Sequence, residues 1–66
     1  MSSKIKKPTV KLVGEDGNAF AIIGRVSAAL RKAGYKEEYI EKYQEESVSG
    51  DYDNLLVTAT KYVNVK

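Results

Sequence analysis

The sequence predicts a mainly helical α+β domain in which a short N-terminal strand precedes three helices, in the order β-α-α-α. Three observations support this: a β-branched alternating segment at 9–13, a long stretch of helical periodicity beginning at Ala19, and a Ser49-Gly50 break between two further helical segments. We expect residues 1–7 to form a flexible basic tail and residues 8–66 to form a single small globular domain.

The predicted strand at 9–13 reads TVKLV, and Pro8 is suited to the entry of such a strand. A glycine-containing acidic turn, GEDG at 14–17, follows it, and Asn18 is a favourable N-cap for the first helix.

The first helix has one apolar face and ends at a glycine. Arg31 and Lys32 precede Gly34, which is the expected order at a helix C-terminus, where cations offset the dipole and glycine adopts the left-handed conformation. The residues expected to face the core are Ile22, Ile23, Val26, Ala29, Leu30 and Ala33.

The second helix is expected over 36–48, with a narrow apolar side formed by Tyr39, Ile40 and Tyr43. Asp51 is a natural N-cap for the third helix. The alternation at 63–65 also allows a short C-terminal strand that pairs with the first. Tyr52, Leu55, Leu56, Ala59, Tyr62 and Val63 are expected to share one face of the third helix.

The composition argues against catalysis. The chain has no histidine and no cysteine, so the commonest general base and the strongest nucleophile are both missing. The same absence makes disulfides impossible and a zinc site improbable. We therefore expect no enzymatic activity, no cofactor and no metal site.

A chain of 66 residues is near the size at which one core barely suffices, so self-association into a homo-oligomer is expected. The basic start leads into no apolar stretch of signal-peptide or membrane-span length, which favours a cytoplasmic protein without a membrane partner.

Charge is distributed unevenly along the chain. Residues 1–36 carry eight cations and two anions, whereas residues 37–66 carry three cations and seven anions. The two halves can neutralise each other within the domain, pair between subunits, or present a basic face to an acidic partner.

The turn before the first helix can be interpreted in two ways. A strand that leads into a helix through glycines is a place where backbone amides can bind an anion, here those of Asn18, Ala19 and Phe20 with help from Arg25 or a neighbouring subunit's lysine. However, the turn is acidic and lacks the Gly-Lys-Ser/Thr of a phosphate loop, which favours simple capping.

Tyr35, Tyr39 and Tyr43 recur every four residues. They either border the core or form an interface or ligand-stacking surface, where aromatic faces lie beside Arg31, Lys32 and Lys36.

Two other binding motifs have weaker support. The DYDN segment at 51–54 lacks the full calcium-loop pattern and is better explained by capping. Nucleic-acid binding through the basic N-terminal half is disfavoured because the later helices are acidic.

The segments VGEDGNAFAIIGRVSAALRKAG and SGDYDNLLVTATKYVNV resemble a family of small uncharacterised bacterial and phage proteins. The shared motifs are VG-x-DGNAF-x-I-x-GRV and SGDYD-x-LL, and the resemblance covers about residues 10–65. It implies a phage or mobile-element setting and supplies no activity.

Together these observations predict a non-catalytic binding protein. The leading hypothesis is that an oligomer sequesters a small anionic ligand, such as a nucleotide signal of host defence, with an anti-defence role. The alternative is a protein–protein inhibitor or adaptor that uses the tyrosine and acidic-helix surface to contact a host protein, and nucleic-acid association is the weaker third option.

Overall fold

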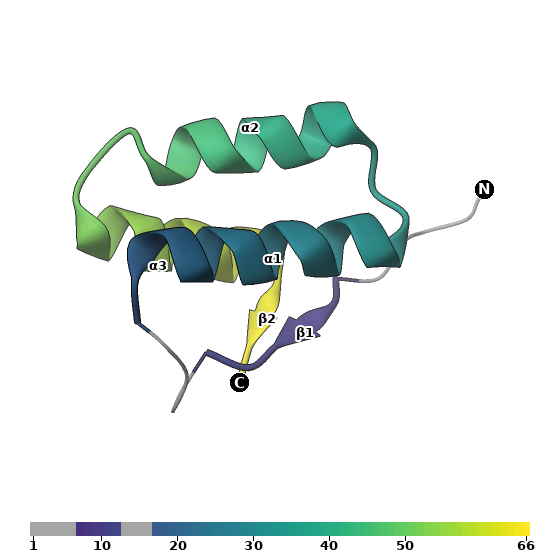
Figure 1. The fold of residues 1–66 in the computed structure, drawn as a ribbon, viewed down its shortest axis with the longest axis horizontal. Helices are drawn as coiled ribbons and strands as arrows, with labels where there is room; N and C mark the ends of the chain where they lie inside the picture. Colours follow the sequence, from purple (N-terminus) through teal and green to yellow (C-terminus); the bar gives the residue numbers. More distant parts are fainter. Residues whose placement is uncertain (1–6, 13–16) are drawn as a thin grey trace.

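The computed structural model describes residues 7–12 and 17–66, and its element order is the predicted one. The tail residues 1–6 and the turn residues 13–16, including Glu15 and Asp16, lie outside the described part of the chain. The elements are β1 (Thr9–Val10), α1 (Ala19–Ala33), α2 (Glu37–Ser47), α3 (Tyr52–Tyr62) and β2 (Asn64–Val65). The mainly helical α+β class is confirmed: α1 and α2 lie side by side, α3 lies behind α1, and the strands pair beneath the helices (Figure 1).

The two strands are parallel, with Thr9 opposite Asn64 and Val10 opposite Val65. The amides of Asn64 and Lys66 donate to the carbonyls of Pro8 and Val10, both at 2.9 Å. Parallel strands need a long crossover connection, which the three helices provide here. Strand β1 is shorter than the predicted 9–13, because the partner strand spans only two residues, although the Leu12 amide still reaches the Lys66 carbonyl at 3.3 Å.

Both predicted ends of α1 are confirmed. The Asn18 side chain caps the helix by accepting a hydrogen bond from the Phe20 amide at 2.8 Å. Gly34 has a φ of 102°, its amide donates to the Arg31 carbonyl, and the Tyr35 amide donates to the Leu30 carbonyl. This pair of bonds is a Schellman motif, in which glycine avoids the steric cost of the left-handed conformation.

Helices α2 and α3 also begin where the sequence predicts, to within one residue. Lys36 precedes α2 without a side-chain capping bond. Asp51 caps α3 by accepting from the Asn54 amide at 2.9 Å. The Glu46 carbonyl accepts hydrogen bonds from the side chains of Ser49 at 2.7 Å and Asn54 at 2.9 Å, which closes the connection between the two helices.

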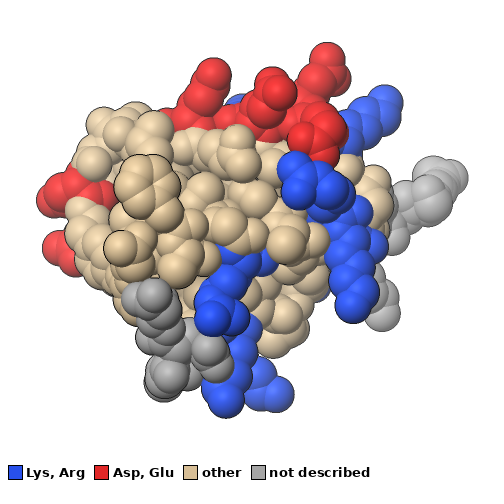
Figure 2. Space-filling view, viewed as in Figure 1, with Lys and Arg blue, Asp and Glu red and all other residues tan. Residues whose placement is uncertain are grey.

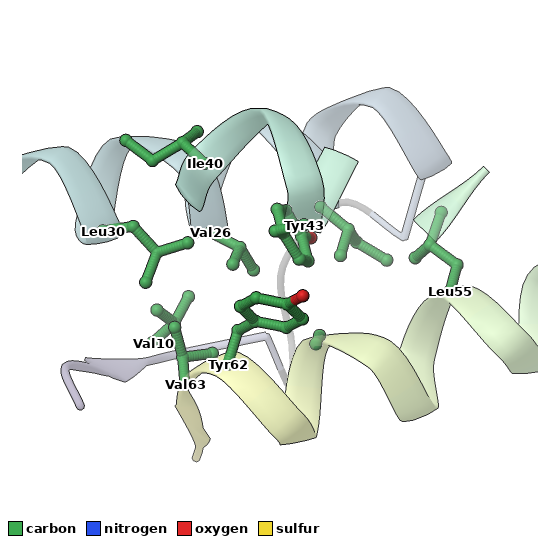
Figure 3. Close-up of a cluster of buried hydrophobic side chains, with 10 residues drawn as sticks. Val10, Val26, Leu30, Ile40, Tyr43, Leu55, Tyr62 and Val63 are labelled. Atoms are coloured by element: carbon green, nitrogen blue, oxygen red, sulfur yellow. The ribbon is translucent and has the colours of Figure 1, made fainter. Parts of the chain in front are cut away.

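The core lies between the three helices and is sealed by the strand pair (Figure 3). Tyr43 from α2 and Tyr62 from α3 lie at its centre, with ring centroids 5.2 Å apart in an edge-to-face arrangement. The buried hydrophobic residues are Val10, Ile22, Val26, Leu30, Ile40, Tyr43, Leu55, Ala59, Tyr62 and Val63. Tyr52 lies at the start of the same face of α3 and is 45% exposed, so that face is only partly buried.

Among the residues that the structure describes, three polar side chains are buried with this core: Ser27, Ser47 and Thr58. Ser27 accepts a hydrogen bond from Gln44 Nε2 at 2.9 Å, and Thr58 donates to the Asn54 carbonyl at 2.7 Å. The hydroxyls of Ser47 and Tyr43 reach no partner at hydrogen-bond geometry among the described residues. Burial raises the pKa of Tyr43, and the nearby Ser47 hydroxyl opposes this rise.

Candidate functional site

A hollow of about 470 Å³ lies at the corner between α1 and α2. Gly34, Tyr35, Lys36, Glu38, Tyr39 and Lys42 line it, and we call it the tyrosine pocket. It is shallow and widely open to solvent, and its surface is mostly apolar. Its volume is within the range of small-molecule sites.

The local sequence positions both rings of this pocket. The left-handed Gly34 turns the chain at the end of α1 and places Tyr35 two residues before α2. Tyr39 follows one turn later, and the two rings are stacked with centroids 4.7 Å apart and planes inclined by 13°. The four-residue spacing of Tyr35 and Tyr39 therefore places two stacked aromatic rings side by side at the surface.

The aromatic pair continues into the core. Tyr39 contacts Tyr62, with ring centroids 5.1 Å apart, and Tyr62 in turn contacts Tyr43. The row therefore runs from Tyr35 and Tyr39, which is 38% exposed, to Tyr43, which is fully buried. Burial and the adjacent Tyr35 raise the pKa of Tyr39 above its ordinary value.

Charged side chains surround the opening of the pocket. Lys36 and Lys42 contribute two cations and Glu38 one anion. Arg31, which the sequence places near this surface, instead pairs with Glu37 through Nε–Oε2 at 2.6 Å and Nη2–Oε1 at 3.0 Å. This hydrogen-bonded pair lowers the pKa of Glu37 and raises that of Arg31. The lysines are thus the charged groups best placed to meet an anion.

The amide part of the predicted site lies at the other end of α1. Asn18, Ala19 and Phe20 begin a helix of 15 residues, which separates them from Tyr35 by roughly 22 Å at 1.5 Å per residue. The Phe20 amide is already used by the Asn18 cap. One chain therefore does not bring the predicted amides and tyrosines into a single site.

The other predicted residues are dispersed as well. Arg25 is exposed on α1. Tyr43 is a correction, because it has no exposed surface and packs against Tyr62 in the core, so a ligand in solvent cannot stack on it. Lys42, one turn after Glu38, is a pocket residue that the sequence analysis missed, although the i, i+4 spacing carries the signal.

A second hollow of about 280 Å³ lies beside the start of α1. We call it the Phe20 groove. Phe20 is 83% exposed at its edge, and Val48, which is 64% exposed, comes from the α2–α3 connection. The groove is lined by Ala19, Phe20, Ile23, Ser47, Val48, Gly50, Asp51, Tyr52 and Leu55.

The charges are segregated on the surface that carries α1 (Figure 2). Acidic side chains follow α2 along the top edge and gather at the left end, whereas basic side chains cover the right half and the lower edge. The described residues include the ion pair between Arg31 and Glu37 and a second pair between Lys61 and Glu46, at 2.7 Å.

The part of the chain that the structure describes contains no group of three acidic residues placed to hold a metal ion. In the same part, every helix is too short or too polar to cross a bilayer. Comparison of the chain with protein-family models, curated proteins and solved structures finds no match.

Proposed function

We propose that this chain is a non-catalytic binding protein that takes a flat, anionic small molecule of the nucleotide class at the tyrosine pocket, and that it acts as a homo-oligomer. The observation that carries the proposal is the stacked Tyr35–Tyr39 pair beside Lys36 and Lys42. A nucleobase can extend an aromatic stack, and a phosphate can pair with a lysine ammonium group.

The resemblance to bacterial and phage proteins supplies a setting for this role. A small phage-encoded protein that binds a nucleotide signal would lower its free concentration in the host cytoplasm and so oppose a host defence. Stoichiometric binding requires no general base or nucleophile, which agrees with a chain that has neither histidine nor cysteine.

The test is thermal unfolding in the presence of a panel of mononucleotides and cyclic nucleotides. A ligand that binds only the folded state raises Tm in proportion to the logarithm of its concentration. We expect at least one nucleotide to raise Tm, and no shift at millimolar concentration across the panel would contradict the proposal.

Variants then localise the binding. Combined Lys36→Gln and Lys42→Gln should abolish the shift, whereas Lys11→Gln, at an exposed position on the chain after β1, should retain it. Tyr35→Phe keeps the ring and should retain binding, and Tyr35→Leu should lose it. A shift that survives both pocket variants and is lost with Arg25→Ala would move the site to α1.

A basic protein partner is the second candidate, and the acidic edge of α2 supports it. Glu38, Glu41 and Glu45 are all exposed on this helix (Figure 2). A lysine-rich octapeptide titrated by calorimetry should bind the native chain, and substituting these three glutamates by glutamine should abolish the binding. The same acidic edge opposes nucleic-acid association, which would be recognised by its steep dependence on salt.

A further inference from the structure

We infer that two copies of this chain associate through the outer face of α1, with the two helices antiparallel and Gly24 at the two-fold axis. The inference deepens the homo-oligomer part of the proposed function by naming its surface, and it does not depend on the tyrosine pocket. The surface comprises Phe20, Ala21, Gly24 and Ala28 of α1, and we call it the α1 outer face.

Phe20 is the first reason. It is the chain's single phenylalanine, it is 83% exposed, and it begins the face of α1 that points away from the core. The Phe20 groove continues this apolar surface towards Val48 and Tyr52. Large aromatic side chains exposed beside other apolar residues are typical of protein interfaces.

Gly24 is the second reason. It lies inside α1, where glycine is less favourable than alanine. A Cβ added there would meet nothing within 4 Å, and its φ is not positive, so neither packing nor backbone conformation within the described chain requires glycine. A helix that approaches closely from outside would require it, since the distance between packed helices depends on the side chains at their contact.

The spacing of the face is self-complementary. Phe20 and Ala28 lie four residues on either side of Gly24, and both are exposed. When two α1 helices run antiparallel with Gly24 at the axis, Phe20 of each copy lies over the small Ala28 of the other. A two-fold interface uses the same patch on both copies, so each large side chain must meet a small one in this way.

Charge selects the antiparallel direction. Asp51 lines the same groove as Phe20, at the end of the molecule where α1 begins, whereas Lys32 lies in the last turn of α1, next to Arg31, whose guanidinium is paired with Glu37. Figure 2 shows acidic side chains at the left end of this face and basic ones over its right half. Antiparallel copies bring the basic end of one to the acidic end of the other, and parallel copies would place like charges together.

The first test is sedimentation equilibrium from micromolar to millimolar concentration. We expect a monomer–dimer equilibrium, and Gly24→Gln should raise its dissociation constant at least about tenfold. The matched control is Glu41→Gln, which introduces the same residue on exposed α2 and should leave the constant unchanged. Gly24→Ala should raise the Tm of the dilute monomer by about 4–8 °C, because it improves helix propensity, which shows that the fold tolerates a side chain there.

The second test uses the absence of cysteine from the native chain. Gly24→Cys should form a disulfide-linked dimer rapidly under oxidised glutathione, because cysteines at the axis come within bonding distance. Ala28→Cys, which faces Phe20 of the other copy, should cross-link more slowly, and Glu41→Cys should not cross-link above the rate of random collision.

The outcomes separate this inference from the rest of the proposed function. A strict monomer at every concentration overturns both the surface and the oligomer, while nucleotide binding is measured independently. A dimer that is unaffected by Gly24→Gln, or whose Ala28→Cys variant cross-links faster than Gly24→Cys, overturns the surface and its register alone.

Discussion

The Tyr62 hydroxyl donates a hydrogen bond to Glu46 Oε1 at 2.9 Å and thereby ties α3 to α2 beside the core. The second carboxylate oxygen of Glu46 accepts from Lys61 Nζ at 2.7 Å. These two bonds lower the pKa of Glu46, and the bond from Lys61 contributes more than the bond from Tyr62. Burial, together with the hydrogen bond to Glu46, raises the pKa of Tyr62 to about 12. The folded state is therefore stabilised when the Tyr62 phenol is protonated and when the Glu46 carboxylate is deprotonated.

The first prediction is a loss of stability in acid. Because the pKa of Glu46 is lower in the folded chain than its ordinary value of 4.5, the folded state binds that proton less readily than the unfolded state. The contribution is present at neutral pH and is lost as pH falls below about 4.5. Denaturant unfolding at several pH values should show that Glu46→Gln flattens this decline. The neighbouring, exposed Glu45→Gln should not, and equal effects of the two variants would contradict the assignment.

The second prediction concerns alkaline pH. The unfolded Tyr62 loses its proton near pH 10, whereas the folded one keeps it until about pH 12. The contribution of the Tyr62 phenol to the free energy of unfolding is therefore fully present below pH 10, and it is lost as pH rises towards 12. Tyr62→Phe should lower stability at neutral pH and reduce the slope of stability against pH in this window. An unchanged slope would show that folding does not raise the pKa of Tyr62 in solution.

The third prediction concerns Gly34, whose φ of 102° is the left-handed conformation that a Cβ disfavours. Gly34→Ala should destabilise the fold by about 1–2 kcal/mol and displace Tyr35, which follows it. The measurements are urea unfolding and the nucleotide-induced Tm shift. Gly24→Ala at dilute concentration is the matched control and should be stabilising, so destabilisation by both substitutions would contradict the conformational explanation.

The fourth prediction compares two buried serines. Ser47 lacks a hydrogen-bond partner among the described residues, so Ser47→Ala should be neutral or slightly stabilising. Ser27 accepts from Gln44, so Ser27→Ala leaves that amide without its buried partner and should cost about 1 kcal/mol. Chemical denaturation of both variants measures the difference. Equal losses would mean that Ser47 is bonded in solution, with Tyr43 the nearest candidate.

The fifth prediction concerns the start of α1, where the Tyr52 hydroxyl donates to the Gly17 carbonyl at 2.5 Å. Tyr52→Phe removes the bond that joins this segment to α3 and keeps the ring. Backbone amides in the first turn of α1 should then exchange faster with solvent, while those of α2 keep their rates. Uniform acceleration throughout the chain would instead indicate a global loss of stability.

Much of the fold followed from local patterns. Asn18 and Asp51 cap their helices as predicted, and Gly34 ends α1. Apolar spacing in α1 correctly placed Ile22, Val26 and Leu30 in the core. These features depend on neighbours within a turn of helix, so the sequence contains the information that determines them.

Other features depended on partners distant in the chain. Helical spacing alone did not predict that Ser27, Ser47 and Thr58 would be buried, because their neighbours come from other helices. It likewise grouped three tyrosines that the fold separates, leaving Tyr35 and Tyr39 at the surface and Tyr43 in the core. Whether a serine, threonine or tyrosine side chain is buried depends on which helix or strand packs against it. The periodicity of a single helix does not contain this information.

The sequence by itself therefore determined the helices, their ends and the β-α-α-α order, since propensity, capping and apolar periodicity are local properties. Only the tertiary structure decided that the strands pair in parallel, that Arg31 is paired with Glu37 while lysines surround the tyrosine pocket, and that Phe20 and Gly24 face outwards. The physical reason is that these relationships join residues through packing and charge between elements, and the arrangement of those elements exists only once the chain has folded.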